Sequence, residues 1–226
     1  VIGLAILVFV PMIGSTQIVV TPGDLGPGEP YRLVFYLDDV NTGGSFDLRT
    51  TATSADIGFY NDHIRQSIIL FPELRAYDWT ALVSTTTVDA RDNTGTNPTD
   101  AGHASVPIYS LTGVRVADDN IDLWDGTIQS FIVDPDCLCE DSNSVLTGSN
   151  TDGTKDSDGY VVGNLAGLVA IGYMAERTDS GWVNNRTVLT TSLSGLPAVS
   201  EVITVGEIFD DGFESATWGA WSAAAP

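Results

Sequence analysis

The spacing of apolar residues divides the first third of the chain into one buried strand and one amphipathic helix. Residues 31–37 are mostly β-branched, aromatic or leucine, which is typical of a strand inside a sheet. From residue 54 to residue 71 the apolar positions recur at helical intervals and therefore share one face of a helix. These positions are Ile57, Tyr60, Ile64, Ile68 and Phe71. Ser54 or Asp56 is suited to cap this helix, and Pro72 stands just past its end.

The rest of the chain predicts shorter elements. In order, they are a strand at 79–84 that three threonines extend to 87, a hairpin of 106–109 and 114–116, a short helix at 121–124 capped within 118–120, an apolar segment at 163–174, and a closing strand at 187–191. Two polar loops, 93–104 and 134–159, are longer than ordinary connections. Because long loops on a compact domain often carry function, we expect them to form the ligand surface.

The two ends of the chain differ in composition from its middle. Residues 1–16 form an uncharged apolar run that closes on small residues of the kind signal peptidase accepts. We expect a secretory signal peptide that is truncated at its start. An uncleaved membrane anchor or a self-associating strand is the alternative. Breaker-rich residues 17–30 lead into a single domain at 31–205, and residues 206–226 form an acidic-aromatic tail.

The tail contains the run Phe209-Asp-Asp-Gly-Phe-Glu-Ser215, followed by Trp218 and Trp221. This run resembles a short C-terminal motif that recurs in otherwise unrelated secreted bacterial proteins. The resemblance implies an export or surface-sorting address. An edge strand, or a tail whose aromatic rings dock on the domain, is the alternative interpretation of the same residues.

A series of short motifs follows the first strand and helix. They are Trp79–Ser84, Ala90-Arg91-Asp92, Val106–Leu111, Ile121–Gly126, Thr147-Gly148 with Asp152-Gly153, and Thr178–Trp182. Their order resembles the endostatin-like branch of the C-type-lectin-like fold, including small secreted bacterial domains, over residues 31–192. The resemblance implies an α+β domain with a twisted, mostly antiparallel sheet, one long amphipathic helix, one short helix and long loops. It also implies a secreted, extracellular or cell-surface bacterial protein.

The charge balance argues against two kinds of partner. The chain has 30 acidic and 9 basic residues, for a net charge of −21. It therefore lacks the Lys/Arg surface that binds nucleic acid or an anionic membrane. Asp accounts for 23 of the acidic residues and Glu for 7. Because Asp closes turns, caps helices and ligates calcium, this bias indicates a loop-rich domain. Solubility, a saline environment and cation-binding loops are all open as reasons for the acidity.

The only two cysteines, Cys137 and Cys139, are separated by a single residue. A disulfide between them would be strained, and two thiols are too few for a closed zinc site. We expect free or locally paired thiols in a loop. The stability of the domain must then come from its core rather than from a disulfide framework.

The best candidate for a metal site is the segment 150–159. Its candidate calcium ligands are Asn150, Asp152, Asp156 and Asp158. Calcium binds several oxygen atoms, and Asp or Asn alternating with other residues can supply them from one loop. The segment does not match the EF-hand pattern, and Lys155 opposes a cation. A solvated loop of Asx turns is therefore the alternative.

A second candidate ligand site combines Asp134 and Asp136 with Trp182 and Asn184. Sugar-binding C-type lectins set a proline between two oxygen-bearing side chains and complete a calcium site with a Trp-Asn-Asp run. Pro135 and the run from Trp182 to Asn184 copy part of that pattern. The resemblance therefore implies a calcium-assisted glycan site at these residues.

Three tryptophans and one pair of charges are expected to build the scaffold. Trp79, Trp124 and Trp182 stand beside small residues and turns, as core residues of a loop-rich domain do. Arg91 and Asp92 are adjacent, and a buried ion pair between them would anchor the loop that follows. Two solvated charges are the alternative.

The sequence has no recognisable catalytic signature. It lacks a nucleophile elbow, a zinc-protease motif, a P-loop and a dinucleotide fingerprint, and its only histidines are His63 and His103. We expect a non-catalytic binding or cell-surface module, with a glycan or a protein as ligand and calcium as the one candidate cofactor. A self-assembling extracellular structural protein is the first alternative. A secreted hydrolase that uses Asp or Glu chemistry is the second.

Overall fold

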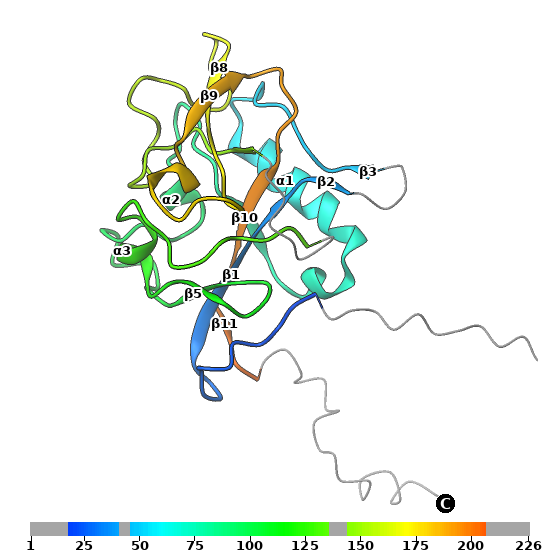
Figure 1. The fold of residues 1–226 in the computed structure, drawn as a ribbon, viewed down its shortest axis with the longest axis vertical. Helices are drawn as coiled ribbons and strands as arrows, with labels where there is room; N and C mark the ends of the chain where they lie inside the picture. Colours follow the sequence, from blue (N-terminus) through cyan, green and yellow to red (C-terminus); the bar gives the residue numbers. More distant parts are fainter. Residues whose placement is uncertain (1–17, 41–45, 136–143, 207–226) are drawn as a thin grey trace, which may run out of the picture.

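The computed structural model describes residues 18–40, 46–135 and 144–206 (Figure 1). Asp136, both cysteines, the apolar segment 1–16 and the tail after residue 206 lie outside these ranges. The helices are α1 (Ile57–Ser67), α2 (Ala90–Asn93) and α3 (Asn120–Leu123), with 3-10 turns η1 (Ile68–Leu70), η2 (Pro72–Ala76) and η3 (Ser180–Trp182). The strands are β1 (Pro30–Leu37), β2 (Asp39–Val40), β3 (Phe46–Asp47), β4 (Trp79–Ala81), β5 (Ile108–Ser110), β6 (Arg115–Ala117), β7 (Val145–Leu146), β8 (Leu168–Gly172), β9 (Arg186–Leu189), β10 (Leu196–Ser200) and β11 (Ile203–Thr204). An α+β chain was expected, and this part of the prediction is confirmed.

A six-stranded sheet runs through the middle of the molecule, in the order β4-β10-β1-β5-β6, with β11 also paired to β1. Only the β1–β5 pair is parallel among the strand pairs of this sheet. Every residue of β1 after Pro30 is buried. The predictions of a buried strand at 31–37 and of a mostly antiparallel sheet are therefore confirmed.

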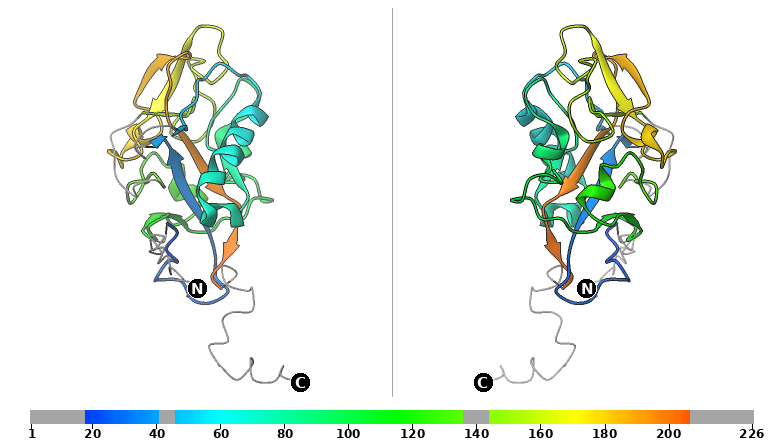
Figure 2. Two further views of the ribbon diagram at one scale, coloured as in Figure 1. Left: turned by 90° about the vertical axis from the view of Figure 1, so that its right-hand side faces the viewer. Right: turned by 90° about the vertical axis from the view of Figure 1, so that its left-hand side faces the viewer.

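The long helix α1 lies against one face of this sheet (Figure 2). Asp56 caps it by accepting the N–H of Gly58 at 2.9 Å, as one of the two expected caps. The α-helical hydrogen bonding ends at Ser67, and the predicted apolar stripe continues through η1 to Phe71. Phe71 itself is extended, with φ −117° and ψ 91°, because the proline that follows disfavours the α-helical conformation at the residue before it.

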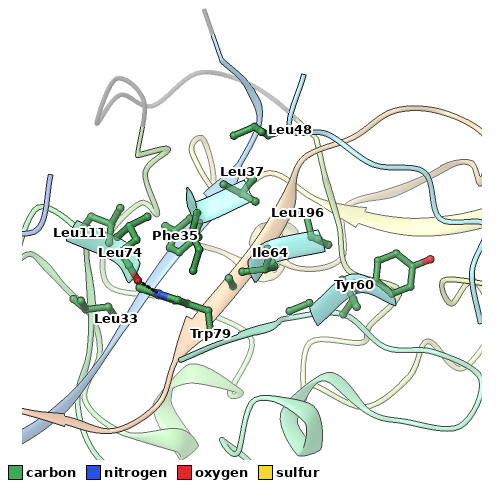
Figure 3. Close-up of a cluster of buried hydrophobic side chains, with 14 of the residues drawn as sticks. Leu33, Phe35, Leu37, Leu48, Tyr60, Ile64, Leu74, Trp79, Leu111 and Leu196 are labelled. Carbon is green, nitrogen blue, oxygen red and sulfur yellow. Dashed lines mark hydrogen bonds between the residues drawn. The ribbon is translucent and has the colours of Figure 1, made fainter. Parts of the chain in front are cut away.

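The space between α1 and the sheet holds the larger of two hydrophobic clusters, here called the helix-side core (Figure 3). Phe35 and Trp79 meet edge to face there, with ring centroids 4.6 Å apart. The indole Nε1 of Trp79 donates to the carbonyl of Leu74 at 2.7 Å. The lead-in also joins this cluster, because Val19 is buried in it.

The other face of β1 carries the second cluster, here called the loop-side core. Successive residues of a strand point to opposite faces, so Val34 and Tyr36 lie on the side away from Phe35. No long helix covers them among the described residues; short helices, turns and loops do. The rings of Trp124 and Trp182, with centroids 5.7 Å apart, belong to this cluster.

A three-stranded antiparallel sheet, β7-β8-β9, lies at the end of the molecule opposite β11 (Figure 1). β9 pairs only with β8 in the described part of the chain, and three of its four residues are exposed. It is therefore an edge strand. Strands β2 and β3 form a separate short ribbon.

Three details of the expected order are corrected by the structure. The strand that begins at Trp79 ends at Ala81, and Thr85 makes only an isolated bridge to Val162, so the extension to residue 87 is wrong. The segment predicted to close the domain is the edge strand β9, whereas β10 completes the central sheet. No strand was predicted at residues 196–200, where β10 lies with Pro197 as its second residue.

Candidate functional site

The two long loops predicted to carry ligand meet at Trp124. Its indole Nε1 donates to Thr96 Oγ1 in the first loop at 2.9 Å. In the second loop, Gly153 lies so close to the indole that a Cβ there would stand 2.6 Å from Cδ2. Gly153 also has a φ of +76°, so this position needs glycine on both grounds. We call the surface formed by residues 93–104 and 150–159 the loop platform.

The 150–159 loop is tied to the rest of the domain at several points. The backbone N–H of Lys155 donates to Asp89 Oδ1 at 2.9 Å, just before α2. The backbone N–H of Arg91 donates to the carbonyl of Gly153 at 3.2 Å. The side-chain amide of Asn184 donates to Asp156 Oδ2 at 3.1 Å. The loop is therefore held in one conformation by groups from separate parts of the chain.

Three of the four candidate calcium ligands brace this loop with their side chains. Asp152 Oδ1 accepts the backbone N–H and the hydroxyl of Thr154, at 3.0 and 2.6 Å. Asp156 is buried, and its Oδ1 accepts the backbone N–H of Asp158 at 2.9 Å. Asn150 donates its amide to the carbonyl of Lys155 at 3.0 Å. The side chain of Asp158 is exposed. No group of three or more His, Cys, Asp or Glu in the described ranges is arranged to hold a metal ion.

The ionisation of Asp152 is shaped by these contacts. Partial burial opposes a charge there, but the hydrogen bonds from Thr154 and the positive charge of Arg91 outweigh it. Together they hold the pKa of the Asp152 carboxyl below its ordinary value of 3.8. Asp152 is therefore a carboxylate at neutral pH.

Turns and caps account for part of the strong bias toward Asp. Many Asp and Asn side chains accept the backbone N–H of the residue two positions later, which is the Asx-turn contact. They are Asp56, Asn97, Asp100, Asp119, Asp125, Asp152, Asp156, Asn164 and Asp179. Solvated Asx loops, the alternative to a calcium site, are thus a prominent feature of this domain.

The residues of the lectin-like candidate site are only partly brought together. Asp134 is buried, and its Oδ2 accepts the backbone N–H of Asp38 at 3.1 Å, at the end of β1. Asn184 instead bonds to Asp156 in the loop platform. Trp182 is fully buried against Trp124, so its ring faces the interior rather than solvent. Asp136 lies outside the described residues.

The residues expected to form the scaffold divide into two groups. Trp79, Trp124 and Trp182 are 1%, 5% and 0% exposed, so all three lie in the interior. Arg91 is half-buried and donates from Nη1 to the carbonyl of Asp152, whereas Asp92 is exposed and accepts from Asn97. The buried Arg91–Asp92 ion pair is therefore wrong. Adjacent positions on the first turn of α2 point the two side chains toward different loops.

One polar cluster was missed by reasoning from the sequence. Arg115 donates to Asp24 and Asp118 at 2.6 and 2.7 Å, and its guanidinium lies 5.3 Å from the ring centroid of Tyr109. The phenol of Tyr109 also donates to Asp24, at 3.1 Å. These contacts fasten the lead-in to the β5–β6 hairpin. A basic residue in a strand of so acidic a chain was the available signal.

The two histidines contact backbone groups. His63 Nε2 lies 2.8 Å from the carbonyl of Leu48, and His103 Nδ1 accepts the backbone N–H of Asn97 at 3.2 Å.

No protein-family model matches the chain, and no curated protein matches its sequence. Across residues 18–40, 46–135 and 144–206, none of the helices has the length and apolar character needed to cross a bilayer.

Proposed function

We propose that this chain is an exported, non-catalytic binding or cell-surface module with a C-type-lectin-like, endostatin-like domain. In this proposal the loop platform contacts an extracellular glycan or protein. The observation that supports it most is the convergence of both long loops on Trp124. Loops held by a rigid scaffold are where such domains vary their specificity.

The chemistry of the platform suits a polar ligand. Exposed side chains such as those of Asp100, Asp152 and Asp158 offer acceptor oxygens, and Lys155 offers a donor. Sugar hydroxyls and polar protein groups can bond to both kinds of group. The net charge of −21 disfavours nucleic acids and anionic membranes as ligands.

A glycan array probed with the exported protein tests this function. We expect binding to at least one glycan, weakened about tenfold or more by the pair of changes Lys155→Ala and Asp158→Asn, because the first removes an exposed ammonium group and the second removes an exposed negative charge. Asp62→Asn and Arg65→Ala, on the exposed face of α1, form the matched control. A glycan whose affinity falls only in the control variant would contradict the platform as the site.

Calcium assistance is tested separately by thermal melting. A calcium site of the affinity usual in extracellular modules should raise Tm by roughly 3–10 °C at about 10 mM calcium. Asp158→Asn should abolish the rise because it removes a candidate ligand charge, whereas Asp125→Asn, in another exposed Asx turn, should leave it unchanged. An identical Tm in calcium and in chelator would remove calcium from the proposal.

A self-assembling extracellular protein is the second candidate, and the edge strand β9 favours it. Leu165, Leu189 and Leu193, in and beside the β8–β9 ribbon, are 104%, 59% and 51% exposed. Residues 180–200 include no acidic side chain, so two copies meeting there avoid the repulsion of their other surfaces. Light scattering should then show oligomers, and the Leu189→Lys variant should be a monomer. A monomer at every concentration would reject this candidate.

A further inference from the structure

The carboxylate of Glu73 binds the backbone at residues 18 and 19, where the described part of the chain begins. Glu73, in η2, accepts two successive backbone N–H groups at the same oxygen: Ile18 at 2.9 Å and Val19 at 2.8 Å. Glu73 is separated from them by more than fifty positions in the sequence, so the contact is tertiary. Successive N–H groups turned toward one oxygen form an anion-binding nest.

The residues after this contact are packed into the domain. Ile18 lies against the helix-side core, and Val19 is only 5% exposed within it. The N–H of Val20 donates to the carbonyl of Leu111 at 2.8 Å. The domain is therefore closed from residue 18 onward, with Glu73 at the entry point.

The charge of Glu73 is only partly balanced. Among the described residues, no lysine, arginine or histidine forms an ion pair with it. Its neighbour Tyr77 is buried, and this burial, together with the Glu73 charge, raises the pKa of the Tyr77 phenol. Two neutral N–H groups stabilise a carboxylate less than an adjacent cation does. The backbone nitrogen next in line toward the N-terminus belongs to Gln17.

We propose that Glu73 is the binding site for a newly made N-terminus, produced by hydrolysis of the Thr16–Gln17 bond. Water gives its hydroxyl to the Thr16 carbonyl carbon and a proton to the Gln17 nitrogen, and that amine gains a second proton at neutral pH. The resulting ammonium then pairs with the Glu73 carboxylate. The inference rests on the proposed export, because it takes residues 1–16 as the removed segment.

The pairing couples processing to stability. In the uncut chain the nitrogen of residue 17 is a neutral amide, so the ion pair forms only after cleavage. Pairing raises the pKa of the α-amine above its ordinary value near 8. The added stability is therefore complete below that ordinary pKa and is lost as the pH rises through the raised one.

A cycle of four proteins tests the pairing. Each comprises residues 17–226 with Gln17→Ser, which prevents cyclisation of an N-terminal glutamine, and each carries either a free or an acetylated α-amine. Each form is made with Glu73 and with Glu73→Gln, whose amide oxygen still accepts both N–H groups. At pH 6.5 we expect the free amine to raise Tm by about 2–4 °C in the Glu73 background only. That difference should vanish near pH 10.

Equal melting of the free and acetylated forms, or the same difference in both backgrounds, would overturn the pairing. Acetylation leaves the side chains unchanged, so the test does not depend on Glu73→Gln alone. N-terminal sequencing of the protein secreted by its host tests the cut. A first residue at Gln17 supports the cut, and any other first residue overturns it. Failure of export itself is recognised separately, by protein that stays inside the cell with residues 1–16 attached.

Discussion

The two sides of the central sheet are stabilised in different ways. The helix-side core is covered by α1, which satisfies its own backbone hydrogen bonds and needs to contribute only an apolar face. The loop-side core is covered by loops, whose backbone groups must find partners elsewhere. The comparison teaches that one face is maintained chiefly by side-chain packing and the other by packing together with buried polar contacts.

Buried hydroxyl groups supply those partners on the loop side. Ser84 Oγ accepts the backbone N–H of Ala90 at 2.9 Å and lies 2.8 Å from Ser149 Oγ. Thr147 Oγ1 donates to the carbonyl of Val183 at 2.6 Å. The hydroxyl-bearing residues are all fully buried. They join segments that are far apart in the sequence and fix loops that carry the proposed ligand surface.

The largest effect is expected from the tryptophans. Trp79→Ala and Trp182→Ala should each lower the free energy of unfolding by about 3–5 kcal/mol, because both side chains are buried. The phenylalanine variants separate the two sides. Trp79→Phe leaves the Leu74 carbonyl without its hydrogen-bond donor. Trp182→Phe breaks no such bond, because the indole N–H of Trp182 has no hydrogen-bond partner among the described residues. Chemical denaturation should therefore show Trp79→Phe as the more costly; the reverse order would show that the Trp79–Leu74 hydrogen bond adds little to the helix-side core.

A matched pair of glycines isolates the contact beneath the loop platform. Gly153→Ala should cost about 2–4 kcal/mol, since a Cβ would collide with Trp124 and φ is +76°. Gly159→Ala has a similar φ of +82° but no atom within 4 Å of its Cβ, so only about 1–2 kcal/mol is expected. Thermal melts of the two variants measure the difference. Equal losses would mean that the Trp124 ring shifts to make room for the added Cβ.

The helix side was largely predictable from the sequence. The apolar stripe, the Asp56 cap and the Pro72 stop each depend on residues a few positions apart. Such local patterns survive whatever packs against them. The same was true of the β5–β6 hairpin, whose turn places Gly113 at a φ of +76°.

The loop side was less predictable, because its contacts join distant residues. Nothing in the sequence indicates that the side chain of Asn184 donates a hydrogen bond to Asp156, or that the backbone N–H of Lys155 donates one to Asp89. The sequence predicts a metal site in the segment 150–159, yet its acidic residues are open to two interpretations. An isolated Asp that closes an Asx turn and one that awaits a cation have the same spacing. Only the direction of the carboxylate oxygens distinguishes them.

A serine-to-alanine change, made once on each side of the sheet, is expected to give the next smaller loss of stability. Ser84→Ala should cost about 1–3 kcal/mol, because it leaves the buried N–H of Ala90 without an acceptor. Ser67→Ala, at the end of α1, should change the stability by less than about 0.5 kcal/mol, since alanine favours the helix. Urea titration compares them. A Ser67→Ala loss as large as that of Ser84→Ala would show that hydroxyl groups matter equally on both sides.

The smallest effect is expected at the exposed rim, where Arg115 makes shorter and charged contacts. Its hydrogen bond with Asp118 lowers the pKa of that carboxyl, and its contact with Asp24 likewise outweighs desolvation and lowers the Asp24 pKa. Solvent and salt screen charges at such a surface, so shorter bonds there need not stabilise more than buried neutral ones.

The pH dependence of this contact follows from its sign. A carboxyl whose pKa is depressed by folding adds stability above its ordinary value of 3.8, and that stability is lost as the pH falls through the lowered one. Asp24→Asn should therefore lower Tm slightly at pH 7 and less at high salt, and the gap to the parent protein should close as the pH drops below 3.8. A gap that is independent of pH and salt would instead show that the charge of the Asp24 carboxylate is not what stabilises this contact. The exposed rim would then resemble the buried loop side rather than contrast with it.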